Sequence, residues 1–166
     1  MIGIRAAETG EASAIAQLVV DSYAEFQDRL TAGNWAIMQT NLRRAVLDPG
    51  RGQPLVATVD GALGGFILYF PPGRSDGVLF PEAWASIRLL GVAPAMRGHG
   101  LGKALVEECL RRARAEGAQT FGLHTSELMK TARAMYERMG FTVVRELEPR
   151  LGVRYWLFQL GLARAD

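Results

Sequence analysis

Three glycines at alternate positions, in the stretch MRGHGLGKAL at residues 96–105, constrain this chain more than any other feature. The glycines follow Arg97 and lead directly into helix-forming residues. Backbone amides at the N-terminus of a helix have no intrahelical partner and carry partial positive charge, and glycines let an anion approach without meeting a Cβ. The stretch therefore predicts a strand-to-helix loop that binds a phosphate group.

Two common phosphate-binding loops do not fit this spacing. The P-loop needs a glycine five residues before its Gly-Lys pair and a hydroxyl after it, but these positions hold Arg97 and Ala104. The dinucleotide fingerprint, counted from Gly98, needs a glycine where the chain has Lys103, and no acidic residue ends the next predicted strand near His124. Both of these loop types are excluded.

Composition predicts one globular domain over residues 1–166, since 49% of the residues are hydrophobic and 22% are charged. The net charge of +2, without long runs of Lys or Arg, argues against a nucleic-acid partner. No apolar stretch is long enough for a signal peptide or a membrane span. A lone Cys109 and two histidines provide neither a disulfide nor a metal site. We therefore expect a cytoplasmic protein without a metal and without a membrane partner.

The pattern of apolar residues and turn residues predicts alternating helices and strands. Helices are expected at 11–26, at 35–47 with Asn34 as the N-cap, at 101–117 and at 127–140. Strands are expected on both sides of a tight turn at Asp60 and Gly61, and at 84–92, 118–125, 141–147 and 153–160. The segment 71–82 is rich in turn residues and is expected to be a loop that borders a pocket. The chain is therefore assigned to the α/β class.

Two motifs resemble those of one protein family. Arg97, Gly100 and Gly102 form an RxxGxG pattern after an apolar strand, and ARAMYERMGF at 132–141 places Tyr136 shortly before a Gly-Phe pair. The first motif resembles the acetyl-CoA-binding motif of the GNAT superfamily of N-acetyltransferases, and the second resembles a later helix of that family. The motifs cover residues 84–141, and the order of predicted elements extends the resemblance over the chain.

The resemblance implies a GNAT fold in a single domain: a mixed, mostly antiparallel central sheet of six to seven strands flanked by about four helices. The two central strands, near 86–93 and 120–125, are expected to splay apart and admit the pantetheine arm of acetyl-CoA. Backbone groups of the strand would pair with that arm, and backbone amides of the loop, including that of His99, would hold the pyrophosphate. The expected cofactor-binding residues are Leu90, Gly91, Val92, Arg97, Gly98, His99, Gly100, Leu101, Gly102 and Lys103.

For catalysis, Tyr136 matches the family tyrosine that acts as general acid toward the departing thiolate. A phenol has an ordinary pKa of about 10, which suits this task where the geometry is close. The glutamate that several members use as general base is replaced here by Ser86, and a frequent asparagine is replaced by Met129. Glu82 and His124 are the remaining candidates for the base, and the assignment stays open between them and water.

The expected function is transfer of an acetyl group from acetyl-CoA, as co-substrate, to a primary amine of a small molecule or peptide. Backbone donors that stabilise the oxyanion would supply about 3 to 4 kcal/mol each. Two alternatives stay open: a CoA-binding regulatory module without turnover, suggested by Ser86, and a transferase for a longer acyl group. The apolar final strand YWLFQL, at 155–160, also predicts a homodimer if its edge is exposed.

Overall fold

A computed structural model describes residues 1–163, which fall into two compact units. The first unit comprises Met1–Tyr69 and Ile87–Cys109, and the second comprises Phe70–Ser86 and the chain from Leu110 onward. The expectation of a single domain over 1–166 stays a prediction.

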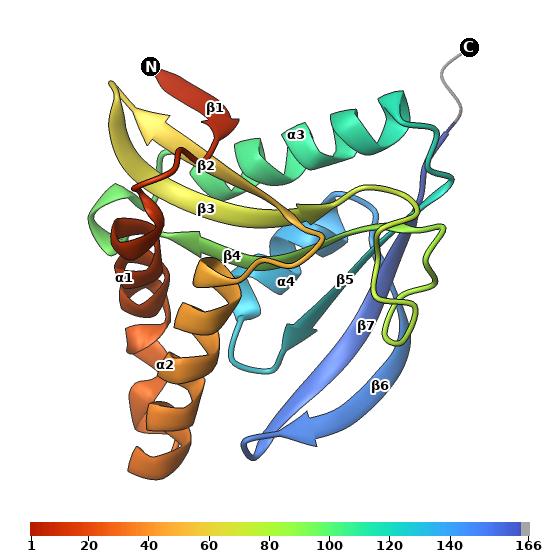
Figure 1. The fold of residues 1–166 in the computed structure, drawn as a ribbon. Coiled ribbons are helices and arrows are strands. Elements are labelled where there is room, and N and C mark those ends of the chain that lie inside the picture. Colours follow the sequence, from red (N-terminus) through yellow and green to blue (C-terminus); the bar gives the residue numbers. More distant parts are fainter. Residues whose placement is uncertain (164–166) are drawn as a thin grey trace. The chain divides into compact units, whose positions relative to one another are not determined.

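Three antiparallel strands follow one another in the first unit, apart from the last residue of the third: β1 (Ile2–Ala6), β2 (Gln53–Val59) and β3 (Ala62–Phe70) (Figure 1). The turn between β2 and β3 consists of Asp60 and Gly61, whose φ values are 49° and 85°. Asn, Asp and Gly adopt such left-handed conformations at the lowest cost, which is why this dipeptide favours a two-residue hairpin turn. The predicted hairpin is confirmed.

Helices α1 (Ala12–Tyr23) and α2 (Ala32–Leu47) lie side by side in the same unit (Figure 1). The prediction of a helix to residue 26 was too long, because the chain tightens into a 3-10 helix, η1 (Ala24–Arg29), after Tyr23. The predicted cap of the second helix was wrong too. Thr31 is the N-cap: it has extended backbone angles, and its hydroxyl accepts a hydrogen bond of 3.0 Å from the Asn34 amide.

Strand β4 (Ala85–Val92) is followed by a short 3-10 helix, η2 (Pro94–Met96), and by helix α3 (Leu101–Ala115). The start of α3 packs closely on β3, because a Cβ added at Gly64 would lie 2.8 Å from a Leu101 methyl carbon and one at Gly65 would lie 3.1 Å from a Leu105 methyl carbon. The predicted helix is confirmed, and an apolar stripe along it belongs to the core. Its buried members in this unit are Leu101, Leu105, Val106 and Cys109.

The second unit contains strand β5 (Thr120–Ser126), helix α4 (Lys130–Arg138) and the strands β6 (Thr142–Arg150) and β7 (Val153–Gly161). Strand β7 pairs antiparallel with β5 along one edge and with β6 along the other. The route to a dimer through an exposed edge of the final strand is therefore wrong, since both edges of β7 are already paired. A homodimer by any other route stays a prediction.

The strands form one mixed, seven-stranded sheet in the order β1-β2-β3-β4-β5-β7-β6. Residues Ala85 and Ser86 of β4 lie in the second unit and pair in parallel with Phe121 and Gly122 of β5, whereas the strand pairs β1-β2, β2-β3, β5-β7 and β6-β7 are antiparallel. The expected α/β sheet with about four helices is thus confirmed. The expected splaying of the central strands involves residues of both units and stays a prediction.

Candidate functional site

The glycine loop, defined as residues 97–103, follows η2 and includes the first three residues of α3, all in the first unit. Gly98 and Gly100 have φ values of +84° and +79°, in the left-handed region that side chains disfavour. A Cβ at either glycine would meet no atom of the described residues within 4 Å. Glycine is therefore required at these two positions by backbone conformation, and the space beside them is open.

The backbone amides at the start of α3 are the groups that suit an anion. The hydrogen bond from the Ala104 amide to the Gly100 carbonyl, at 3.0 Å, opens the helical pattern. The amides of Leu101, Gly102 and Lys103 precede it, in the turn where a helix leaves its donors without an intrahelical partner. The macrodipole adds partial positive charge at the same end. The predicted strand-to-helix loop is thus present in a form that can hold a phosphate.

Gly102 connects this loop with β4. A Cβ at Gly102 would lie 3.6 Å from a methyl carbon of Leu90 and 3.8 Å from one of Val92, which is ordinary van der Waals contact. The structure therefore brings together the two groups of residues expected to hold the cofactor, the strand residues 90–92 and the glycine loop.

The basic side chains of the loop are engaged elsewhere. The Arg97 guanidinium donates to the Ser22 carbonyl at 2.9 Å and to the Glu25 carboxylate at 2.5 Å. The Lys103 ammonium lies 3.8 Å from the carboxylate of Glu107, one turn further along α3. The loop therefore offers backbone amides to an anion, while the charged groups of these two side chains contact other protein groups.

Sequence reasoning missed a feature of β4 at Leu89. Its φ is +61°, a left-handed conformation that costs a non-glycine residue about 1–2 kcal/mol. Such a residue inside a strand redirects the neighbouring peptide groups, directly before Leu90 to Val92. A glycine or asparagine would have indicated this conformation, whereas a leucine leaves no signal in the sequence.

Tyr136 lies on α4 in the second unit and is 5% exposed. Its ring meets Phe141 edge-on, with 5.8 Å between the ring centroids. Burial and the contact with Phe141 therefore restrict the orientation of the Tyr136 ring. Its predicted role as general acid stays a prediction.

His124 lies half-buried on β5. The centroid of its ring is 6.3 Å from that of the Phe80 ring and 5.9 Å from that of the Tyr155 ring. Burial raises the pKa of Tyr155, against a smaller opposite effect of the Arg150 charge. Phe80 belongs to the loop that the sequence predicted to border a pocket, so this loop contacts β5 beside His124.

Glu82 is exposed in the same loop, and its backbone carbonyl accepts a hydrogen bond of 2.6 Å from the Gly73 amide. Ser86, at the position of the family glutamate, is 1% exposed, and its hydroxyl lies 2.8 Å from that of Ser75. Ser75 donates in turn to the Trp84 carbonyl at 2.7 Å. Ser86 therefore belongs to a buried hydroxyl pair, and it carries no group that could serve as the base.

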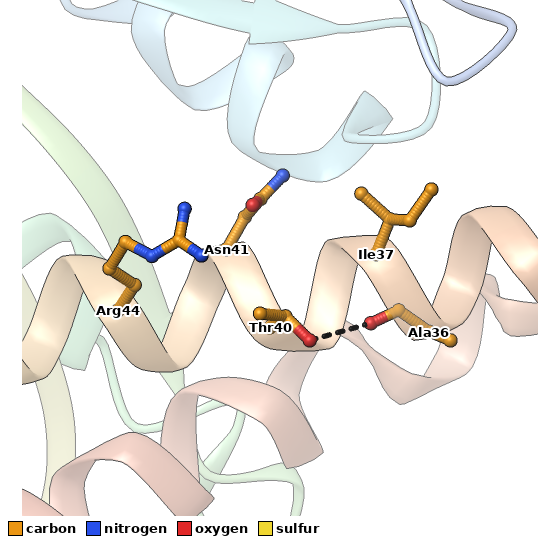
Figure 2. A pocket seen from close by; sticks show the side chains of 5 residues that line it. All are labelled: Ala36, Ile37, Thr40, Asn41 and Arg44. Atoms are coloured by element: carbon orange, nitrogen blue, oxygen red, sulfur yellow. Dashed lines mark hydrogen bonds between the residues drawn. The ribbon is translucent and has the colours of Figure 1, made fainter.

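An open hollow lies on the surface of α2, lined by Ala36, Ile37, Thr40, Asn41 and Arg44. The side chains of Ile37, Asn41 and Arg44 extend from the same side of the helix, as expected at intervals of three and four residues (Figure 2). The Thr40 hydroxyl donates to the Ala36 carbonyl at 3.2 Å. The hollow thus combines an aliphatic surface with an amide and a cation.

Residues 1–163, which the structure describes, carry neither a metal-ligand cluster nor a membrane-spanning helix. Within these residues, no group of three or more His, Cys, Asp and Glu side chains is placed to hold a metal ion. In the same part of the chain, every helix is too short or too polar to cross a bilayer.

The sequence profile of the Acetyltransferase (GNAT) family matches residues 13–141, and the chain therefore belongs to this family. Two mycothiol acetyltransferases are similar to it: the one from Frankia alni is 35% identical over 130 residues, and the one from Streptomyces scabiei is 36% identical over 108 residues. These alignments cover 72% and 62% of this chain, but only 37% and 33% of the relatives. The chain thus spans about a third of the length of the curated relatives it matches.

Solved structures share the fold. The ribosomal-protein-S18-alanine N-acetyltransferase from Escherichia coli superposes with a TM-score of 0.67 at 18% identity, covering 100% of this chain and 97% of that one. A protein from Salmonella typhimurium, solved with its cofactor acetyl-CoA, gives a TM-score of 0.67 at 20% identity, covering 100% of this chain and 96% of that one. The GNAT fold expected from the two motifs is therefore confirmed.

Proposed function

We propose that this protein transfers an acetyl group from acetyl-CoA to a primary amine. The observation that carries the proposal is the glycine loop, where two glycines in left-handed conformations precede the amides of Leu101 to Lys103 in open space. The similarity to a structure that contains acetyl-CoA supports the same cofactor. A cytoplasmic location, expected from the lone cysteine, is part of the proposal.

The glycine loop would bind the pyrophosphate of CoA through its backbone amides, because helix N-termini favour anions. The strand residues Leu90 to Val92 would pair with the amides of the pantetheine arm. The left-handed Leu89 supports this role, since it redirects the peptide groups of β4 at this point. The loop and these strand residues lie within one unit, so this half of the site rests on contacts inside that unit.

In the transfer itself, the amine nitrogen attacks the thioester carbonyl carbon, and the new C–N bond forms as charge develops on the carbonyl oxygen. Backbone donors placed at that oxygen would stabilise it. The C–S bond then breaks, and the CoA thiolate takes a proton from the phenol of Tyr136 while the former amine loses a proton to a base. Tyr136 is the proposed general acid.

His124 and Glu82 are the proposed candidates for the base. A half-buried imidazole among aromatic rings is restrained in orientation, which favours His124 for a directed proton transfer. Glu82 is exposed and would act through water.

The acceptor is proposed to be a small molecule or peptide that carries a primary amine. One relative is named mycothiol acetyltransferase and one structural neighbour is named ribosomal-protein-S18-alanine N-acetyltransferase, so both small molecules and alanine peptides belong in a test panel.

The test is release of the CoA thiol from acetyl-CoA over a panel of amino sugars, amino acids, polyamines and peptides with N-terminal alanine. A blank without acceptor subtracts hydrolysis, and the buried Cys109 gives little background with thiol reagents. Release with one acceptor class and a matching acetylated product in mass spectrometry supports the proposal. Binding of acetyl-CoA without release across the panel contradicts it.

A second function, a CoA-binding module without turnover, is favoured by one observation. The position of the family glutamate holds Ser86, which is buried and hydrogen-bonded to Ser75. Propionyl-CoA and longer acyl donors in the same panel distinguish this module from a transferase for longer acyl groups, because only the transferase releases CoA with one of them.

A further inference from the structure

We propose that Arg97 is a positioning residue, which ties the glycine loop to the end of α1 and to η1 so that cofactor binding at the loop is coupled to residues 24–29. The proposal rests on the proposed binding of acetyl-CoA at this loop. The Arg97 guanidinium donates to the Ser22 carbonyl at 2.9 Å and to the Glu25 carboxylate at 2.5 Å. These contacts join residues that are 75 and 72 positions apart in the sequence.

Ser22 is a fixed point for this contact. Its side chain is 6% exposed, and its hydroxyl donates to the Val19 carbonyl at 2.7 Å. The last turn of α1 is also pressed against β4, because a Cβ at Gly91 would lie 2.8 Å from the Ser22 hydroxyl oxygen. A cation is favourable at the C-terminal end of a helix, where carbonyl groups carry partial negative charge. The Ser22 carbonyl therefore presents a rigid acceptor to Arg97.

Arg97 holds the start of the loop to α1, whereas Leu101 packs on β3 and Gly102 lies beside β4 further along. Gly98 and Gly100 have no side chains, and the ring of His99 contacts the Met96 carbonyl at 3.0 Å, only three residues earlier. The contacts of Arg97 reach a different element, whereas that of His99 is local. Displacement of the Arg97 side chain would therefore free the loop from α1.

A substitution of Glu25 distinguishes two roles of Arg97, because the two roles predict opposite changes in the affinity for acetyl-CoA. If the guanidinium served the phosphates directly, the Glu25 carboxylate would compete for it, and removal of that negative charge would strengthen binding of acetyl-CoA. If Arg97 positions the loop, Glu25 holds it in place, and removal of the carboxylate weakens binding. Two acceptors at fixed places suit the forked donors of an arginine and not the single ammonium of a lysine.

The first experiment measures the dissociation constant of acetyl-CoA by calorimetry for the wild type and three variants. Glu25→Gln is expected to weaken binding about threefold, in the range of a partly exposed ion pair. Arg97→Lys keeps the charge but loses the paired contacts, and is expected to weaken binding about tenfold. Asp28→Asn removes the same charge from an exposed position of η1 and serves as the matched control, with an expected change below about twofold.

The second experiment measures the coupling itself by hydrogen exchange. Saturating acetyl-CoA is expected to slow amide exchange in a peptide that covers residues 24–29 in the wild type and in Asp28→Asn. The same protection is expected to disappear in saturated Glu25→Gln, with an unchanged midpoint of thermal unfolding. A salt bridge with a purely structural role would not change how strongly bound acetyl-CoA protects these amides from exchange.

The outcomes separate this inference from the proposed function. Stronger or unchanged binding by Glu25→Gln, or protection of residues 24–29 that persists in that variant, overturns the positioning role while the proposed function stands. If wild-type protein fails to bind acetyl-CoA at all, the proposed function falls and the coupling falls with it.

Discussion

A Cβ added at Gly98 or Gly100 would meet no atom of the described residues within 4 Å, whereas a Cβ added at Gly122 of β5 would lie 2.7 Å from a ring carbon of Phe80. The glycine loop needs glycine at these two positions because the backbone there is left-handed. Strand β5 keeps its glycine because the rings of Phe80 and Trp84 occupy the space of a side chain. The difference separates a loop whose glycines are set by backbone conformation from a strand whose glycine is set by side-chain packing, and the proposed function assigns backbone binding to the loop and side-chain chemistry to the second unit.

The largest effect is expected where a side chain is proposed to do chemistry. Tyr136→Phe keeps the buried ring beside Phe141 and removes only the hydroxyl, so kcat should fall about 100-fold or more, as for loss of a general acid. Acetyl-CoA should bind as in the wild type. Steady-state kinetics with the acceptor found in the panel checks this, and an unchanged kcat would remove Tyr136 from the mechanism.

Packing in the second unit gives the next largest effect. Gly122→Ala forces a Cβ to within 2.9 Å of Trp84 as well as against Phe80, and overpacking of this kind costs about 1–3 kcal/mol of stability. Gly161→Ala, at the end of neighbouring β7, is the control, because its Cβ would meet no described atom within 4 Å. Urea unfolding should separate the two variants clearly. Equal stabilities would mean that the rings move aside and that packing does not require glycine at position 122.

The order and type of the elements were largely predictable from the sequence, but contacts between distant residues were not. The Asp60-Gly61 turn has a local signal, and so does the apolar face of α3. Thr31 and Asn34 are both good capping residues, and only the backbone conformation shows that Thr31 is the cap. The sequence also gives no indication that β7 lies between β5 and β6 in the sheet, because β6 precedes β7 along the chain.

The candidate site shows the same limit. The glycines and Tyr136 could be found because their motifs are contiguous and resemble a family pattern. The partners of Arg97 and of Ser86 could not, since Glu25 and Ser75 lie elsewhere in the chain and no local pattern links them. The left-handed backbone of Leu89 had no signal at all, because nothing in a leucine indicates a positive φ.

Gly102 sharpens the comparison, because it lies in the loop without a left-handed backbone. A Cβ there makes only ordinary contact with Leu90 and Val92, and alanine in a helix is favoured over glycine by about 0.5–1 kcal/mol. Gly102→Ala should therefore leave stability unchanged or slightly higher. The substitution should weaken the binding of acetyl-CoA about tenfold if the pyrophosphate lies against this position. A loss of this size is expected for about one hydrogen bond. Unchanged affinity, measured by calorimetry, would place the phosphates elsewhere.

The smallest effect concerns pH and the first unit. Arg5 donates to both carboxylate oxygens of Glu11, at 2.8 and 2.9 Å, and this contact, with the Glu8 amide, lowers the pKa of Glu11 from 4.5 to about 2. Because the folded pKa is the lower one, the stabilisation is present above about pH 4.5 and is lost as the pH falls toward 2.

Glu11→Gln removes this titration, so its urea midpoint should change less between pH 6 and pH 3 than that of the wild type. The acetyl-CoA affinity of the variant at neutral pH should be unchanged, since Glu11 is not among the residues proposed to bind the cofactor. Identical pH dependence of the two proteins would show that the ion pair contributes nothing to folding stability.

The most direct measurement is a calorimetric titration of acetyl-CoA into the wild type, Gly100→Ala and Gly161→Ala. Gly100→Ala places a side chain on a backbone with φ of +79°, whereas Gly161→Ala changes a glycine outside the loop. We predict saturable one-site binding by the wild type and Gly161→Ala, and a loss of at least about tenfold in affinity for Gly100→Ala. No binding by the wild type, or equal binding by all three proteins, would contradict the assignment of the glycine loop as the acetyl-CoA site.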